Sequence, residues 1–380
     1  MGDADLVRTL GMAGIRSACV TRPGWPADRS RFTAERVEWA DNWGAPDRLL
    51  ANLVEFARSK PEPPPLFFQH DGDLMLVSRN REALRPHLRF TIAAAEVIET
   101  CVDKTVFAVA GERLGLPVPR SVVLWPGVQP ELPELDLEPP LVLKPLTRRD
   151  EWWRPLGGSA KAVQAGTRAD LERLWPSLAA ADVDLVVQEM VPGGEDRIES
   201  YHGYVDASGE VAAEFTGRKI RTYPQRFGET TACEITDAAD VRELGRECMR
   251  RLRLTGVAKL DFKRDPGGRL HLLEANPRFN LWHLPGAVAG VNIPAVVYAD
   301  LLDRPRPRIG PVRAGVRYSV VWKDFKAARA AGTPMRGWAR WQARCDTRHN
   351  LALDDPMPFV GGMVLKRLRR VASPAGEAAR

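Results

Sequence analysis

Two short runs near residue 270 carry the side chains best suited to metal and phosphate chemistry. The first is KLDF, which contains Asp261, and the second is EANPR, which contains Glu274, Asn276 and Arg278. The turn sequence DPGG lies between them and predicts a hairpin that brings the two strands side by side. Two carboxylates and an amide oxygen would then form an oxygen-only site suited to Mg²⁺ or Mn²⁺.

Arg278 adds a cation to this predicted site. Glu274, Asn276 and Arg278 occupy alternate positions, so their side chains share one face of the predicted strand. A fixed guanidinium beside a metal can stabilise a transferring phosphoryl group. The alternative is an ordinary hairpin with a polar outer face, because acidic side chains are common beside turns.

Two lysines occupy positions where a positive charge is unfavourable unless solvent or an anion is near. Lys144 ends an apolar run at 141–143, and Lys104 opens a predicted helix, whose positive end disfavours a cation unless an anion is near. Each side chain either extends to solvent or binds an anion.

Small residues mark two further segments that suit a nucleotide. Residues 157–159 (GGS) could bring backbone N–H groups close to phosphates, although no Walker A motif occurs. Residues 188–195 (QEMVPGGE) end a buried strand whose free backbone groups can pair with an adenine edge, and Glu195 could accept ribose hydroxyls. Both segments are also compatible with ordinary turns.

The elements that must position these residues follow two patterns. Over the first 100 residues helices and strands alternate, which indicates a small parallel α/β unit. After residue 198 strands dominate, with one hairpin, which indicates α+β structure with antiparallel pairing. Strands are predicted at 17–21, 66–69, 121–125, 141–145, 161–164, 185–190, 198–205, 211–221, 256–264, 270–275 and 313–322, and helices at 1–15, 46–59, 103–114, 167–181, 237–254 and 292–302.

Composition narrows the class of protein. The 380 residues are 44% hydrophobic and 27% charged, as in an ordinary multidomain globular protein, and no apolar run approaches the ~20 residues of a membrane span. Five cysteines without a CxxC pair argue against disulfides or structural zinc and favour a reducing cytoplasm. The net charge of +6 is too diffuse for a nucleic-acid protein.

In this order and spacing the motifs resemble the ATP-grasp superfamily, in particular carboxylate–amine ligases of the D-aspartate ligase type. The resemblance implies an ATP-grasp fold after a small parallel α/β pre-grasp domain. The implied domains are 1–100 (pre-grasp), 101–310 (ATP-grasp, with a lid at about 120–187) and 311–380 (an extension with a basic tail). Pre-grasp units usually open with a strand and a glycine turn, whereas this chain opens on a helix, so we expect the native start to lie upstream.

The resemblance also implies a role for each motif. The expected reaction joins a carboxylate to an amine through an acyl phosphate, with ATP and Mg²⁺ or Mn²⁺. Another ATP-grasp reaction, such as a carboxylase, and a nucleotide-binding scaffold without catalysis remain alternatives. The acid and the amine are not encoded in any motif, and a homodimer is possible. The implied sites are Lys104, Lys144 and Ser159 for the phosphates, Glu189, Val191 and Glu195 for the nucleoside, Asp261, Glu274 and Asn276 for the metal, Arg278 and Lys144 for catalysis, and Lys219 and Arg221 for the acid or the γ-phosphate.

Overall fold

A seven-stranded sheet forms the centre of the molecule. The structure is a computed structural model, and it describes residues 3–129, 131–146, 153, 156 and 162–364. The strand order is β11-β10-β7-β8-β9-β12-β13, and all neighbours are antiparallel except the last pair. The strands are β7 (Ile198–Val205), β8 (Val211–Tyr223), β9 (Glu229–Thr236), β10 (Gly256–Arg264), β11 (Leu270–Asn276), β12 (Arg317–Ser319) and β13 (Thr347–Arg348).

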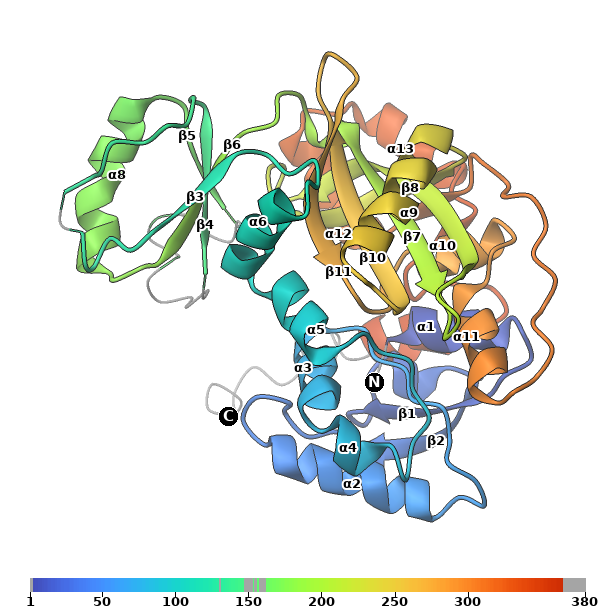
Figure 1. Ribbon diagram of the computed structural model, residues 1–380. Coiled ribbons are helices and arrows are strands. Elements are labelled where there is room, and N and C mark those ends of the chain that lie inside the picture. The colour runs from blue at the N-terminus through green and yellow to red at the C-terminus, as the bar shows by residue number, and fades with distance from the viewer. Residues whose placement is uncertain (1–2, 130, 147–152, 154–155, 157–161, 365–380) are drawn as a thin grey trace, which may run out of the picture.

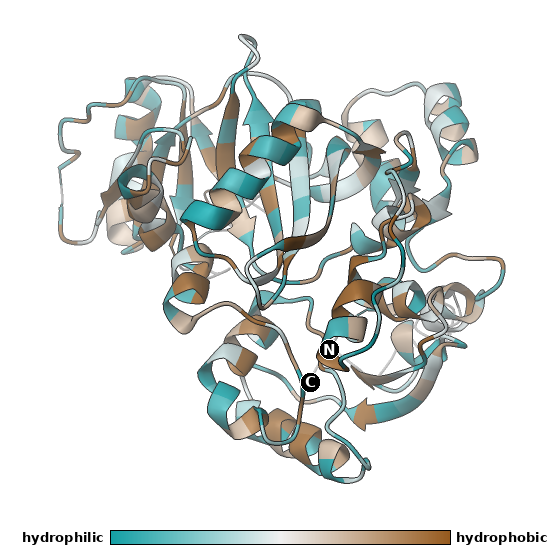
Figure 2. Ribbon diagram, turned by 45° about the vertical axis from the view of Figure 1, so that its right-hand side comes forward, coloured by the Kyte–Doolittle hydropathy of each residue, from teal (hydrophilic) through white to brown (hydrophobic). Residues whose placement is uncertain are grey.

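Helices from residue 239 onward, the first of them inserted between β9 and β10, pack on this sheet (Figure 1). Helix α9 turns Val241, Cys248 and Met249 inward, whereas its outward side is largely hydrophilic in Figure 2. This division is what an amphipathic helix on a sheet requires. The helices of this part are α9 (Ala239–Arg251), α10 (His283–Val288), α11 (Ile293–Leu301), α12 (Val321–Ala330), α13 (Met335–Ala343) and α14 (Met357–Phe359), with short turns at Glu195–Arg197 and Val360–Val364.

A four-stranded antiparallel sheet forms a separate lobe, drawn in green in Figure 1. Helix α8 begins at a capping box, in which Thr167 and Asp170 bond reciprocally to each other's backbone N–H, and it packs Leu171 and Trp175 into the core of the lobe. The elements are β3 (Ser121–Leu124), β4 (Leu141–Pro145), β5 (Val163–Ala165), α8 (Arg168–Ala180) and β6 (Leu185–Glu189), in the order β3-β6-β4-β5.

The N-terminal part contains a parallel pair of strands among short helices. Strands β1 and β2 run parallel, as expected for a pre-grasp unit. The segment before the lobe ends in helix α6, whose first N–H groups are capped by Asp103. The elements are α1 (Ala4–Gly11), β1 (Ser17–Thr21), a turn at Ala27–Arg29, β2 (Thr33–Glu38), α2 (Pro46–Arg58), α3 (Asp71–Arg79), α4 (Arg81–Leu84), α5 (Ala95–Val102) and α6 (Lys104–Arg113).

The structure differs from the sequence prediction at several elements, among them the helices α3, α4, α5 and α10, which were not predicted. Four other differences have a direct physical reason. Strand β2 was not predicted because only Val37 of its six residues is buried, so no alternation marks it. Strand β9 was not predicted because it is buried on both faces and its residues do not alternate. The strand predicted at 66–69 is reduced to one bridge, between Pro65 and Arg89. The strand predicted at 313–322 shortens to β12, after which α12 begins.

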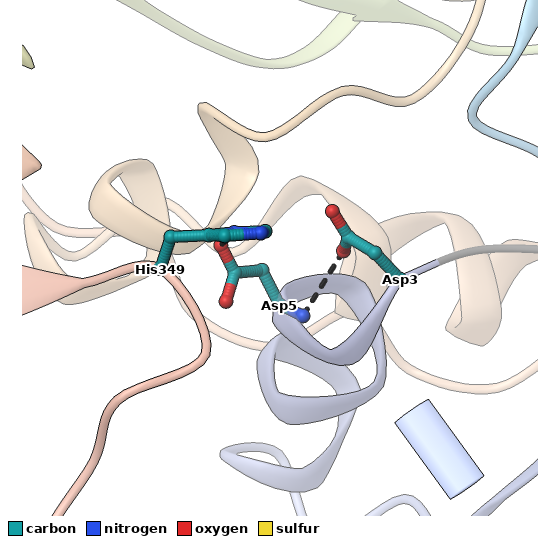
Figure 3. A group of neighbouring side chains, drawn as sticks. All are labelled: Asp3, Asp5 and His349. Atoms are coloured by element: carbon teal, nitrogen blue, oxygen red, sulfur yellow. Dashed lines mark hydrogen bonds and ion pairs between the residues drawn. The ribbon is translucent and has the colours of Figure 1, made fainter. Parts of the chain in front are cut away.

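A buried carboxylate joins the two ends of the described chain. Asp5, at the start of α1, is 2% exposed and accepts hydrogen bonds from the Tyr318 hydroxyl at 2.7 Å and the backbone N–H of Asn350 at 3.1 Å, and it pairs with Nδ1 of His349 at 2.7 Å. Figure 3 shows the imidazole beside Asp5, with Asp3 accepting the backbone N–H of Asp5. Asp3, Asp5 and His349 are close enough to hold a metal ion, but the donors already on Asp5 make the group an ion-paired network.

Replacing His349 by Ala should destabilise the protein by about 3 kcal/mol. The change leaves the buried charge of Asp5 without its cation, and the loss lies at the low end of the range for broken buried pairs because the ring is 24% exposed. The measurement is urea unfolding of both proteins at pH 6. A loss below about 1 kcal/mol would show that the pair does not stabilise the fold.

The same pair should make stability depend on pH. Burial by itself would lower the pKa of His349, but the carboxylate of Asp5 outweighs it and raises the pKa to about 9 from 6.5. Because the pKa is higher in the folded state, the ion pair contributes its full free energy to stability below about pH 6.5. That contribution is lost as the pH rises through about 9. The difference in stability between wild type and H349A should therefore shrink between pH 6 and pH 10. An equal difference at both values would contradict this origin.

Within the part of the chain that the structure describes, no helix is both long and apolar enough to cross a membrane.

Candidate active site

Ten of the twelve residues singled out in the sequence line one cavity. Its volume is about 650 Å³, and its walls come from the large sheet, the four-stranded lobe, α6 and the segment before α3. The structure therefore brings together residues that lie far apart in the sequence. The ten are Lys104, Lys144, Glu189, Val191, Glu195, Lys219, Asp261, Glu274, Asn276 and Arg278.

The three predicted metal ligands lie on neighbouring strands of the hairpin. Asp261 of β10 is directly opposite Glu274 of β11, and Asn276 follows two residues later on β11. Asp261 is 1% exposed, Asn276 is half-buried and Glu274 is exposed to the cavity. The DPGG turn closes the hairpin, with the backbone N–H of Gly268 bonded to the carbonyl of Asp265. From the turn onward Phe262 pairs with Leu272, and a bulge between Asp261 and Phe262 then shifts the register so that the two carboxylates lie opposite each other.

Two lysines neutralise Asp261. The ammonium of Lys259 lies 2.7 Å from Oδ2 of Asp261, and that of Lys219 lies 3.0 Å from the same oxygen. The hydroxyl of Ser200 donates to Oδ1 at 2.5 Å. Burial would raise the pKa of Asp261, but the two ammonium groups outweigh it and hold the pKa well below its usual range.

Lys259 was not assigned a role from the sequence. It stands two residues before Asp261, so both side chains leave β10 on the cavity side, and Lys263 does the same two residues later. Burial lowers the pKa of Lys259, whereas Asp261 and Glu274 overcome burial at Lys219 and raise its pKa. The alternation of Lys259, Asp261 and Lys263 in the sequence was the signal for this shared face.

Lys104 and Lys144 approach each other from α6 and β4. The ammonium of Lys144 donates to Oε1 of Gln188 at 2.8 Å, and that of Lys104 donates to the carbonyl of Pro145 at 3.0 Å. Burial lowers the pKa of Lys144 to about 8, although Glu274 opposes the shift and Lys104 adds to it. Two close cations in a cavity wall form a site that favours an anion.

The predicted nucleoside residues follow the end of β6. Glu189 accepts the backbone N–H of Glu138 at 3.1 Å, so its side chain is held by the lobe. Val191 is buried in the cavity wall, and Glu195 opens the turn before β7. Burial raises the pKa of Glu195, while Lys219 and Lys263 oppose that shift.

Arg278 is fixed by the N-terminal part of the chain. Its Nε lies 2.5 Å from Oδ1 of Asp71, at the start of α3, and its Nη1 donates to the carbonyl of Gln69 at 2.9 Å. Nη2 reaches Oδ1 of Asn276 at 3.4 Å. Asp3, Gln69 and Asp71 also line the cavity and were not among the predicted residues. The polar run HDGD at 70–73, directly after the strand predicted at 66–69, was the available signal.

Two predicted residues are not found in the cavity wall. Ser159 lies outside the described residues. Arg221 directs both guanidinium arms to Asp324 of α12, at 2.7 and 2.8 Å, and does not line the cavity. The register of β8 with β9 shifts between Lys219 and Arg221, so the two side chains part although they are two residues apart. In this structure Arg221 anchors α12, and the substrate role expected for it stays a prediction.

The donors at the hairpin fit a hard divalent cation. Asp261, Glu274 and Asn276 offer only oxygen atoms, which Mg²⁺ and Mn²⁺ prefer. No hydrogen bond or ion pair to the carboxylate of Glu274 is found among the described residues. The oxygen of Glu274 is therefore open to a ligand, whereas those of Asp261 are held by the two lysines and Ser200.

Comparisons with known proteins agree with this geometry. A family described as "ATP-grasp in the biosynthetic pathway with Ter operon" matches residues 183–323, which include the hairpin. D-aspartate ligase of Enterococcus faecium is 22% identical over 242 residues, covering 60% of this chain and 56% of the relative. D-alanine–D-alanine ligase of Neisseria gonorrhoeae is 24% identical over 211 residues, covering 53% of this chain and 65% of the relative. The chain thus spans between half and two thirds of the curated relatives it matches.

The fold is also similar to solved structures of ATP-grasp enzymes. An ADP complex of N5-carboxyaminoimidazole ribonucleotide synthetase superposes with a TM-score of 0.61 at 13% identity, covering 82% of this chain and 77% of that one. At such low identity the likeness concerns the fold. The chain therefore has the fold of the ATP-grasp enzymes, and it is similar in sequence to proteins named D-aspartate ligase and D-alanine–D-alanine ligase.

Proposed function

We propose that the protein is an ATP-dependent ligase that joins a carboxylate to an amine through an acyl phosphate and releases ADP and phosphate. The observation that supports this most is the convergence of one acidic hairpin and several cations on a single cavity. Its relatives by sequence are named D-aspartate ligase and D-alanine–D-alanine ligase, so amino acids are the first substrates to test.

The charges of the cavity are the ones this reaction needs. A carboxylate resists attack by an amine because oxide is a poor leaving group, and phosphorylation replaces oxide by phosphate. The triphosphate must be neutralised and held in line with the acid, and water must be excluded. We assign Lys104 and Lys144 to the triphosphate and Lys219 to the γ-phosphate. Glu189, Val191 and Glu195 would bind the nucleoside.

The hairpin would hold the metal ion of the nucleotide. Asp261, Glu274 and Asn276 are its expected ligands, and the ion would neutralise charge on the phosphate oxygens. Beside them, Arg278 would contact the phosphoryl group as it passes to the acid. The contacts of Arg278 with Asp71 and Gln69 would hold the guanidinium in place before substrate binds, which avoids reorganisation during the reaction.

The test is ADP release with a panel of acids. Each amino acid, in both enantiomers, and a set of small carboxylic acids would be mixed with ATP, Mg²⁺ and hydroxylamine. Hydroxylamine is a general nucleophile for acyl phosphates, so the assay does not depend on knowing the amine. At least one acid should stimulate ADP release and yield its hydroxamate.

The alternatives give different results in the same assay. A scaffold would bind ATP, measured by calorimetry, but release no ADP with any acid. A carboxylase would release ADP with bicarbonate and an amine, and would form no hydroxamate from the other acids. Either pattern would overturn the proposed ligase.

A further inference from the structure

Both carboxylate oxygens of Asp261 already have partners in this structure. Oδ2 is within 2.7 Å of the ammonium of Lys259 and 3.0 Å of that of Lys219, and Oδ1 accepts the hydroxyl of Ser200. Both lysines are buried, at 8% exposure each. A divalent cation placed on Asp261 would lie beside two positive charges in a site with little water to screen them.

We propose that Lys219 and Lys259 act as resident counterions of Asp261, so that the metal ion binds only together with the nucleotide. The inference rests on the proposed function, because it concerns the metal site of that reaction. The triphosphate supplies anionic oxygens to which the two ammonium groups can transfer. The carboxylate of Asp261 is then free to bind the metal ion. The metal ion therefore binds with the nucleotide and not before it.

The strands explain why these two lysines reach one carboxylate. Lys259 and Asp261 are alternate residues of β10 and therefore share a face. Lys219 comes from β8, and β7 lies between β8 and β10 in the sheet. The β7 residue opposite Asp261 is Ser200, whose short side chain leaves room for a long one to cross. Of the two lysines that bind Asp261, Lys259 therefore comes from the same strand, and Lys219 reaches across β7 from β8.

Glu274 shows the contrast that makes the proposal specific. It lies directly opposite Asp261 and is exposed to the cavity, and within the described part of the chain no hydrogen bond or ion pair holds its carboxylate. One carboxylate of the pair is therefore open and the other is closed by cations. A metal ion alone would meet Glu274 and Asn276 only, which is too few protein ligands for tight binding.

The experiment measures Mn²⁺ binding without nucleotide, by the loss of the free-ion signal in electron paramagnetic resonance. Wild type should bind Mn²⁺ weakly, and Lys259→Met should bind it at least ~10-fold more tightly, because one competing cation is gone. Lys259→Gln keeps a hydrogen-bond donor to Asp261 without the charge. It should behave like K259M if charge, and not the hydrogen bond, excludes the metal.

The matched control is Lys263→Met. Lys263 leaves the same face of β10, is buried to 7% exposure and lines the same cavity, but it makes no ion pair with Asp261. K263M should bind Mn²⁺ as weakly as wild type. Far-ultraviolet circular dichroism and thermal melting would establish that each variant is folded before its binding is compared.

The outcomes separate this inference from the function on which it rests. Wild type that binds Mn²⁺ without nucleotide as tightly as K259M would overturn the counterion proposal, even if the ligase reaction is found. Equal tightening in K263M and K259M would also overturn it, because general charge in the cavity would then be responsible. Adding a non-hydrolysable ATP analogue should give wild type a protein-bound Mn²⁺ spectrum. If no protein-bound Mn²⁺ appears in wild type or K259M, with or without the analogue, the metal site itself is wrong.

Discussion

Replacing Glu274 by Gln should reduce ADP release by ~10²-fold or more, with the fold unchanged. The carboxylate is directly opposite Asp261 and is the open member of the pair, so its charge is the one most available to a metal ion. Gln keeps the size and hydrogen-bonding capacity but removes the charge. Loss of a group that stabilises phosphoryl charge typically costs this much. The measurement is the rate of ADP release with the best acid from the panel.

A second carboxylate in the same cavity provides the control. Glu229 lines the cavity but pairs with Lys323 on the surface, at 2.7 Å, and is not part of the hairpin. Glu229→Gln should retain a rate within a few-fold of wild type. A similar rate in E274Q and wild type would show that Glu274 is not a metal ligand.

Replacing Arg278 by Ala should lower kcat by ~10²-fold or more and change the KM for ATP little. The guanidinium is held at the boundary between the hairpin and the N-terminal part, by Asp71 and the carbonyl of Gln69. From there we expect it to contact the phosphoryl group during transfer and not the bound nucleotide. An interaction made mainly in the transition state affects kcat and kcat/KM together.

Two variants test whether the position of the Arg278 guanidinium matters to the rate as well as its charge. Arg278→Lys keeps one positive charge but cannot make the paired contacts to Asp71 and Gln69, so it should recover only part of the lost rate. Asp71→Asn should have a smaller effect than R278A, because the carbonyl of Gln69 still orients the guanidinium. A variant R278A whose only defect is a raised KM for ATP would assign Arg278 to nucleotide binding.

The hairpin could be predicted from the sequence because every part of it is local. The DPGG turn, the strand lengths and the alternation of Glu274 and Asn276 are all visible within one short stretch. The exact pairing of Asp261 with Glu274 was less predictable, because it depends on a bulge between Asp261 and Phe262. The order of the other motifs along the sequence likewise predicts the ATP-grasp fold.

The remaining features depend on contacts that no local pattern records. Arg278 meets Asp71 across 207 positions of sequence, and Lys219 reaches Asp261 only because β7 places β8 near β10. The separation of Arg221 from Lys219 was not predictable, because a shift of register on β8 parts two side chains that strict alternation would place on one face. No site role was predicted for Lys259, because a lysine on a strand usually extends to solvent.

The most direct test of the account follows oxygen from the acid to phosphate. The acid that stimulates ADP release would be labelled with ¹⁸O in its carboxylate and allowed to react with ATP, Mg²⁺ and an amine, and the released phosphate would be analysed by mass spectrometry. An acyl phosphate predicts ADP and a phosphate that carries one ¹⁸O atom, because the bond between carbon and that oxygen breaks when the amine attacks. Unlabelled phosphate, or label in AMP with release of pyrophosphate, would contradict the proposed reaction.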